Sequence, residues 1–308
     1  MKRAIPLIYF LAPIVCLASR AQTSAAQSTS KPSLNLQDNR SLRVRFIVDR
    51  GDVHIEVIAQ GSGPVIIILP SLGRGAEDYD VVAGLIAKDG FRVLRPEPRG
   101  IGASTGPMTG VTLHDLAADI AAMIEREGKG PVVVVGHAYG HFVARTLATD
   151  RPDLVRGVVL AAASAGKVPT GVHEPSVSPE VREAIDKSGD LSLPEADRLR
   201  YLQFAFFAPG HDPRVWLGGW HPETEKMENA ASRATPVDEW FACGKAPILD
   251  LQAENDAVAP RKFAGVLKGA LGERVTVVVI SNAGHALVPE QPEAMANAIA
   301  AFARTLRQ

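Results

Sequence analysis

An excess of either charge is the first feature that this sequence lacks. Its 33 lysines and arginines balance 34 aspartates and glutamates, so the formal net charge is −1 over 308 residues. Nucleic-acid binding depends on a basic surface that attracts phosphates, and we therefore expect no nucleic-acid partner. With 46% hydrophobic and 22% charged residues, the chain instead has the composition of a soluble globular protein that can bury a large core.

A long, uninterrupted apolar run is missing as well. The N-terminal apolar stretch, residues 4–18, is shorter than a membrane-spanning helix needs, and Pro6 and Pro13 interrupt it. We therefore do not expect this stretch to be a transmembrane anchor.

The same stretch has the layout of a secretory signal peptide. Lys2 and Arg3 precede the apolar residues, and the small residues Ser19 and Ala21 follow them. We predict a signal peptide over residues 1–21 with cleavage near Ala21. The protein is then expected to be secreted or periplasmic, with no stable membrane insertion once the signal is removed.

Cysteine is scarce: the chain contains two, Cys16 and Cys243. Cys16 lies within the predicted signal peptide, so the mature chain would retain a single thiol. One thiol cannot form an internal disulfide, and zinc sites built from two or more cysteines are excluded for the same reason.

The sequence does contain strand patterns, and they are of two kinds. Alternating apolar residues over 43–48 and 53–57 predict an antiparallel hairpin in which Gly51 takes the positive φ of the turn. Thr112, with Asp115 three residues on, predicts the capped start of a helix. Near-continuous apolar runs, separated mostly by helical stretches, predict a mostly parallel sheet with helices on both faces. These runs lie at 65–69, 91–94, 132–135, 158–160, 248–251 and 275–280.

The alternation of strands and helices stops between residues 165 and 240. Eight prolines and every tryptophan of the chain fall in this segment. It is too long for a connection within a compact sheet, so we predict a helical cap over 165–240. The cap would be inserted into a body made of residues 42–164 and 241–308, and residues 22–41, rich in Ser, Thr, Gln and Ala, would form a flexible tether.

One short stretch carries the main chemical question. Residues 132–146, VVVVGHAYGHFVART, pass from an apolar run through Gly136 and Gly140 into helical spacing. This is the layout of a nucleophile elbow, G-x-S-x-G, in which a sharp turn from strand to helix lifts a reactive side chain above a sheet. The residue in the place of the nucleophile is Ala138, whose methyl group is inert.

Four stretches, taken in order, resemble the α/β-hydrolase superfamily over residues 42–308. VIIILPSLGRG occupies the place of the strand and oxyanion loop, RPEPRGIGAST that of a family turn, GHAYG that of the elbow, and SNAGHALVPEQPE that of the loop presenting the catalytic histidine. The resemblance implies an α/β-hydrolase fold with a mostly parallel central sheet, helices on both faces and an inserted helical cap. It also implies a small-molecule substrate. The histidines show no metal-ligand spacing, and we expect neither a metal nor a cofactor.

The resemblance also assigns site residues. It makes His285 the catalytic histidine and Asp256 its acid, in preference to Asp250, which belongs to a strand. A carboxylate beside the imidazole would fix its tautomer and stabilise its protonated form. The backbone N–H groups of Leu72 and Tyr139 would form the oxyanion hole.

Ala138 excludes an acyl-enzyme at the usual position. Ser71 on the oxyanion loop could reach the cleft and contact substrate, although a hydrogen bond from its hydroxyl to local backbone is the simpler interpretation. In the cap, we expect the aromatic side chains Phe207 and Trp216 to contact a small apolar substrate while also packing the cap onto the body.

Three accounts of this site remain open. In the first, which we favour, Ala138 is native and Asp256 and His285 act as a general base in the hydrolysis of a reactive ester or lactone. In the second, the chain is a serine esterase or lactonase inactivated by a Ser-to-Ala replacement at position 138. In the third, it is a pseudo-hydrolase that binds a small molecule without catalysis. The sequence contains no signal for an oligomeric state.

Overall fold

The strands of the chain form one mixed sheet. The computed structural model describes residues 42–168 and 173–306, together with Met1, so the predicted signal peptide and tether lie outside the described residues. Within the described part, eight strands follow the order β1-β2-β4-β3-β5-β6-β7-β8. Their bounds are β1 Val44–Arg50, β2 Val53–Gly61, β3 Val65–Leu69, β4 Arg92–Pro96, β5 Val132–His137, β6 Val155–Ala161, β7 Ile248–Ala253 and β8 Val275–Ile280.

The predicted hairpin is confirmed. β1 pairs antiparallel with β2, and the pairing of Arg50 with Val53 leaves Gly51 and Asp52 as a two-residue turn. Gly51 has φ +65°, the left-handed conformation that such turns require. β2 is also antiparallel to β4, whereas the remaining neighbours are parallel. The expectation of a mostly parallel sheet is therefore confirmed.

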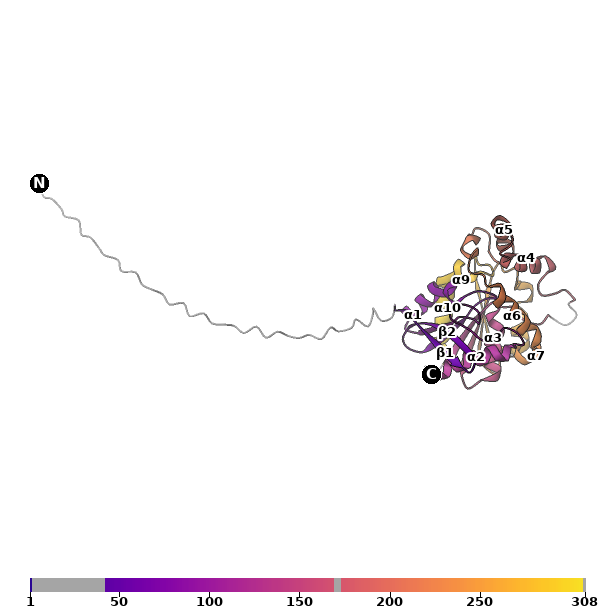
Figure 1. Cartoon of the computed structure of the whole chain (residues 1–308). Helices are drawn as coiled ribbons and strands as arrows, with labels where there is room; N and C mark the ends of the chain where they lie inside the picture. The colour runs from indigo at the N-terminus through magenta and orange to yellow at the C-terminus, as the bar shows by residue number, and fades with distance from the viewer. Residues whose placement is uncertain (2–41, 169–172, 307–308) are drawn as a thin grey trace. The chain divides into compact units, whose positions relative to one another are not determined.

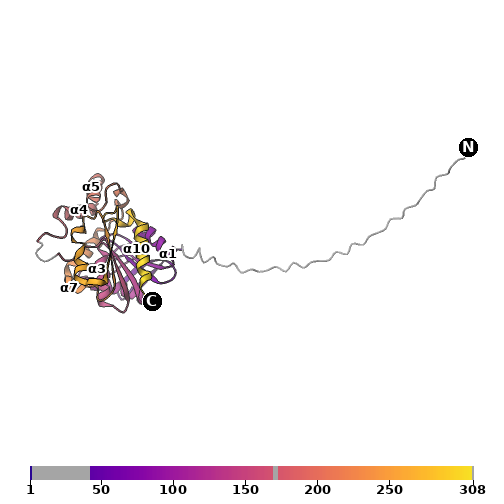
Figure 2. The ribbon, with the colours of Figure 1, turned by 180° about the vertical axis from the view of Figure 1, so that it is seen from behind.

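Helices cover both faces of the sheet, because its central strands bury alternate side chains in opposite directions. On β3, Ile67 packs with α2 (Leu113–Glu127) and α3 (Gly140–Asp150), whereas Ile66 packs with α1 (Asp80–Lys88) and α10 (Pro292–Thr305). Figures 1 and 2 show α3 on one side of the sheet and α1 with α10 on the other. This arrangement explains why the central strands read as continuous apolar runs.

The first turn of α2 is capped as predicted. The Asp115 N–H donates to the Thr112 hydroxyl at 3.3 Å, and the Thr112 N–H donates to the Asp115 carboxylate at 2.8 Å. Both bonds satisfy N–H groups that have no partner within the helix, so two residues readable in the sequence determine where the helix begins.

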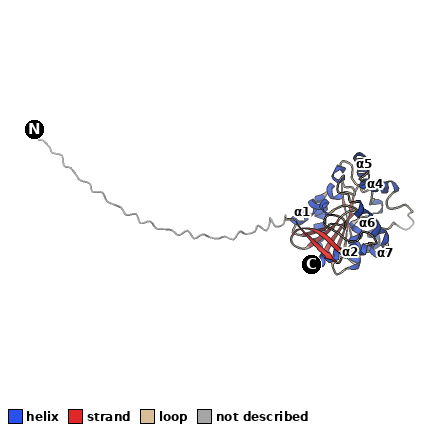
Figure 3. Cartoon of the chain, in the orientation of Figure 1, coloured by secondary structure: helices blue, strands red, loops and turns tan. Residues whose placement is uncertain are grey.

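The segment between β6 and β7 leaves the sheet and returns beside the strand that it left, since β6 and β7 are neighbours. Figure 3 shows helices rather than strands in this segment. They are α4 Pro179–Gly189, α5 Glu195–Ala205, η3 Pro213–Trp216, α6 Pro222–Ala234 and α7 Val237–Trp240. The remaining helices are η2 Ala76–Tyr79, η4 Arg261–Phe263, α8 Gly265–Leu271, η5 Gly272–Arg274 and α9 Leu287–Glu290. Among the described residues, no helix has the length and apolar character needed to cross a bilayer.

Candidate active site

A cavity of about 470 Å³ lies at the carboxyl ends of the parallel strands. The loop after β3 contributes Ser71 and Leu72, the turn after β5 contributes Ala138 and Tyr139, and the loop after β8 contributes His285. Clefts at this edge of an open α/β sheet are the usual place for a ligand. The structure therefore brings these five predicted site residues to one cavity.

The elbow holds Ala138 in a strained conformation. Ala138 has φ +46°, in the left-handed region that is costly for any residue with a side chain. The two flanking glycines are required by close packing. A Cβ on Gly136 would lie 2.5 Å from the backbone of Gly140, and a Cβ on Gly140 would lie 2.4 Å from the Leu69 carbonyl oxygen. The turn is thus built as sharply as a nucleophile elbow, with a methyl group at its tip.

His285 and Asp256 form a buried pair. The Nδ1 atom of His285 lies 3.1 and 3.0 Å from the two carboxylate oxygens of Asp256. The same carboxylate accepts the N–H groups of Val258 at 2.8 Å and Ala259 at 2.7 Å, which fix its orientation. This leaves Nε2 of His285 as the ring nitrogen that can act on a substrate or water.

Two backbone N–H groups at the cavity remain available. The N–H groups next to Leu72 are both used: that of Ser71 donates to the Tyr79 hydroxyl at 2.8 Å and that of Gly73 to the Glu228 carboxylate at 2.7 Å. Within residues 42–168 and 173–306, by contrast, the N–H groups of Leu72 and Tyr139 donate to no other group. Free N–H groups on facing loops are what an oxyanion hole requires.

A chain of hydrogen bonds joins the loops around the cavity. The Ser71 N–H donates to the Tyr79 hydroxyl, which lies 2.8 Å from Nδ1 of His137, and Nε2 of His137 lies 2.9 Å from the His285 carbonyl oxygen. A carbonyl can only accept, so Nε2 of His137 carries the proton and Nδ1 accepts from Tyr79. Burial, followed by the charge of His285, lowers the pKa of His137 to about 3, in keeping with this neutral form.

Sequence reasoning did not identify Tyr79 as part of this chain, and it gave His137 no role. His137 directly precedes the elbow residue, at a position where the superfamily that the sequence resembles commonly has histidine. Its presence there therefore indicated no particular role. Tyr79 lies in a short 3₁₀ helix with no motif around it. Nothing in the pattern marked it.

The aromatic contacts differ from the prediction. Phe206 and Trp220 line the cavity, whereas Phe207 and Trp216, the two aromatic residues predicted to contact substrate, are not among its lining residues. Phe207 and Trp216 are buried in the cluster beneath the inserted helices, 5.6 Å apart between ring centroids. For Phe207 the reason is geometric, because Phe206 and Phe207 follow each other directly after α5 and point in different directions.

Close approach of the His285 loop determines which of these rings reaches the cavity. The Ala286 N–H donates to the Phe206 carbonyl at 2.8 Å. A Cβ on Gly284 would lie 2.5 Å from the same oxygen, so only glycine allows this contact. Phe206 is thereby held against His285, with ring centroids 5.6 Å apart.

Ser71 lines the cavity as predicted, but the simpler interpretation of its hydroxyl is not supported. Among the described residues, the Ser71 hydroxyl makes no hydrogen bond to local backbone. His141 and Ser164 also line the cavity: Nε2 of His141 lies 3.3 Å from the Ser164 hydroxyl, and burial lowers the pKa of His141 well below 6.5. The side chains of Ser71, His141 and Ser164 therefore line the same cavity as His285.

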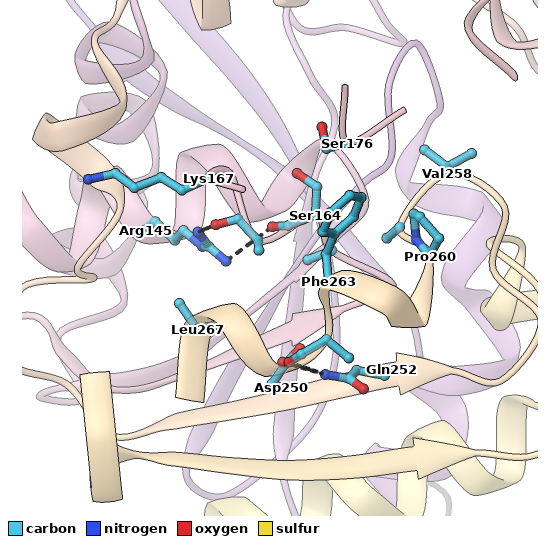
Figure 4. Close-up of a pocket in the computed structure, with 14 residues that line it drawn as sticks. Arg145, Ser164, Lys167, Ser176, Asp250, Gln252, Val258, Pro260, Phe263 and Leu267 are labelled. Atoms are coloured by element: carbon cyan, nitrogen blue, oxygen red, sulfur yellow. Dashed lines mark hydrogen bonds between the residues drawn. The ribbon is translucent and has the colours of Figure 1, made fainter. Parts of the chain in front are cut away.

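A side chamber, whose lining residues are drawn in Figure 4, shares Ser164 with the cavity. Its volume of about 20 Å³ has room for one water molecule. Asp250 lies here, accepting from the Gln252 amide at 2.7 Å, and burial raises the pKa of Asp250 to about 6. Asp250 thus belongs to the chamber, whereas Asp256 contacts His285. In the described part of the chain, no group of three or more His, Cys, Asp or Glu side chains could hold a metal ion.

Comparison with known proteins agrees with this architecture. A family model described as alpha/beta hydrolase fold matches residues 64–190, and one described as TAP-like protein matches residues 223–307. A 2-(acetamidomethylene)succinate hydrolase from Mesorhizobium japonicum is 33% identical over 112 residues, which is 36% of this chain and 40% of that protein. The match therefore spans less than half of that relative.

Two further proteins match over most of the chain. The soluble epoxide hydrolase of a Corynebacterium species is 24% identical over 272 residues, 81% of this chain and 93% of that protein. The crystal structure of an esterase from Exiguobacterium antarcticum has a TM-score of 0.71 at 19% identity, covering 85% of this chain and all of that one. At this identity the structural likeness establishes the fold, and the names of the matching proteins are those of hydrolases.

Proposed function

This chain belongs to the α/β-hydrolase superfamily, and from that premise we propose that it hydrolyses a small ester or lactone with the Asp256–His285 pair and without a serine nucleophile. One observation carries the proposal. A buried His–Asp pair and two unused backbone N–H groups, those of Leu72 and Tyr139, border the same cavity. Together they supply a base and an oxyanion site, which are the two elements that hydrolysis by activated water requires.

In the proposed reaction, Nε2 of His285 takes a proton from a water molecule while the water oxygen attacks the substrate carbonyl carbon. The carbonyl oxygen becomes an oxyanion, which the N–H groups of Leu72 and Tyr139 stabilise. When the bond to the alcohol breaks, His285 returns the proton to the leaving oxygen, and the acid and the alcohol depart. Asp256 stabilises the imidazolium between these steps. The Ala138 methyl group leaves room for water where a serine hydroxyl would stand.

A second candidate has its own support. Ala138 keeps the positive φ of a nucleophile elbow, a conformation that costs about 1–3 kcal/mol in a residue with a side chain. A serine esterase inactivated at position 138 would show this geometry. A pocket that only binds its ligand has no requirement for the strained turn, so the pseudo-hydrolase account has less support.

Two variants separate the accounts: His285→Ala and Ala138→Ser, assayed on activated esters, lactones and epoxides. If His285 is the base, the unmodified protein turns over one of these substrates, and His285→Ala lowers kcat by about 10²-fold or more. If the chain is an inactivated serine enzyme, turnover is almost absent until Ala138→Ser restores it, with an acyl-enzyme visible by mass spectrometry.

The remaining outcomes are equally distinct. Binding without turnover in either form would favour the pseudo-hydrolase. Turnover that survives His285→Ala unchanged would place the chemistry outside this cavity. Arg304→Gln, on the exposed last turn of α10, serves as a control that should leave turnover unaffected.

A further inference from the structure

The cavity changes character from its inner end to its opening. His285 and Trp220 at the inner end are buried, whereas Arg182, Asp186 and Arg233 are exposed. The difference in burial gives the cavity a direction, with the reacting groups inside and the charged groups at the rim.

Two of the inserted helices supply this rim. Arg182 and Asp186 are four residues apart on α4, and Asn229 and Arg233 are four residues apart on α6. Residues at this spacing share one face of a helix. Each helix therefore turns a polar face, with one arginine on it, toward the same opening.

The rim arginines are not engaged by the protein itself. Arg182 and Arg233 make neither an ion pair nor a side-chain hydrogen bond with any residue that the structure describes, although Asp186 lies one turn from Arg182. Two other exposed arginines of the inserted segment, Arg200 and Arg214, each pair with a nearby aspartate. The two guanidinium groups at the cavity are thus left for a ligand.

We propose that the substrate carries a carboxylate, which Arg182 and Arg233 bind at the rim while the scissile bond lies at His285. A guanidinium presents its N–H groups as a planar fork that matches the two oxygens of a carboxylate. Among the charged side chains that line the opening, two arginines outnumber the single Asp186, which favours anionic substrates there. This inference rests on the proposed function and narrows it: the part of the wall that includes Phe206 and Trp220 receives the body of the molecule, and the rim selects for an acid.

Binding can be measured without turnover in the His285→Ala background. Monomethyl glutarate carries one ester and one carboxylate, and dimethyl glutarate is its neutral counterpart. We expect isothermal titration calorimetry at low ionic strength to show the monoester binding several-fold more tightly. Arg182→Gln and Arg233→Gln should each weaken monoester binding about three- to fivefold, the range expected for a solvent-exposed ion pair.

Two further variants serve as controls in the same titrations. Asp186→Asn removes a negative charge from the rim and should tighten monoester binding about twofold, whereas Arg304→Gln removes a positive charge far from the cavity and should change nothing. None of these variants should alter the affinity for the diester. Thermal unfolding of each variant checks that the fold is retained.

Three results would overturn the proposal: equal affinity for the two glutarates, equal losses for both on removing an arginine, or no monoester binding in any form. Failure of the proposed function has a different signature, because it appears in the turnover assays: as turnover only after Ala138→Ser, as no turnover in any form, or as turnover that does not depend on His285. Neither failure entails the other.

Discussion

At position 138, the difference between a methyl and a hydroxymethyl group decides whether an acyl-enzyme can form. The rest of the elbow is in place, since Gly136 and Gly140 allow the sharp turn and Ala138 faces the cavity. A reagent that requires an activated hydroxyl therefore tests this position directly.

A fluorophosphonate probe should fail to label the protein, because Ala138 offers no oxygen to phosphonylate. The measurement is in-gel fluorescence followed by mapping of any modified peptide. Ala138→Ser is the positive control and should become labelled through His285. Labelling of the unmodified protein at Ser71, which lines the same cavity, would show that a substitute nucleophile exists.

Tyr79 stabilises the loops around the cavity through its buried hydroxyl. Tyr79→Phe would leave the Ser71 N–H and Nδ1 of His137 without partners in a fully buried place. Each unsatisfied buried polar group costs about 1–3 kcal/mol, so we expect the free energy of unfolding to fall by at least about this amount in urea denaturation. Tyr201→Phe removes a hydroxyl that is only partly buried and should cost much less. Equal losses would argue against the hydrogen-bonded chain.

Much of the site could be predicted because its residues follow strands whose ends meet. Asp256 and His285 come after β7 and β8, and parallel strands bring such positions to one edge. That Phe206 rather than Phe207 lines the cavity could not be predicted. Two adjacent aromatics at a helix end have no periodicity that says which one points inward, and the choice depends on the docking of Gly284.

Among the secondary-structure elements, α6 connects the inserted segment to the oxyanion loop. The Gly73 N–H donates to Glu228, and the Tyr139 hydroxyl donates to the Glu228 carbonyl at 2.8 Å. Burial raises the pKa of the Glu228 carboxyl to about 8. The sequence predicted helices in this segment but carried no sign of this contact, because it joins residues 155 positions apart.

This burial predicts a pH dependence of stability. In the unfolded chain the Glu228 carboxyl titrates near 4.5, and in the folded protein near 8, so the folded state holds a proton that the unfolded state has lost between these values. The contribution to stability is complete below pH 4.5 and is lost as the pH rises toward and through 8. Glu228→Gln keeps an acceptor for the Gly73 N–H and cannot ionise. Its advantage in free energy of unfolding over the unmodified protein should therefore grow from pH 5 to pH 9, by at most about 1.4 kcal/mol per pH unit.

Glu223→Gln, on the exposed first turn of the same helix, is the matched control and should show no such trend. A constant difference between Glu228→Gln and the unmodified protein across this pH range would mean that Glu228 titrates alike in both states.

For the whole molecule, the remaining prediction concerns its location. We propose export with cleavage near Ala21, because a charged start, an apolar stretch and small residues follow one another in residues 1–21. Loss of Lys2, Arg3 and Arg20 would take the formal charge from −1 to −4. N-terminal sequencing of protein recovered from the periplasm or the medium decides this, and an intact Met1 on cytoplasmic protein would refute it.

The hydrogen-bonded chain behind the cavity has a consequence for how the protein opens. Ser71, Tyr79, His137 and His285 lie on separate stretches of sequence, yet each holds the next, so the loops after β3 and β8 should unlock as one cooperative unit. In native-state hydrogen exchange, the amides of Ser71 and Ala286 should then share a single opening free energy, and Tyr79→Phe should lower both by the same amount. Base and oxyanion site would be assembled together or not at all, which makes a half-formed active site a rare species in solution.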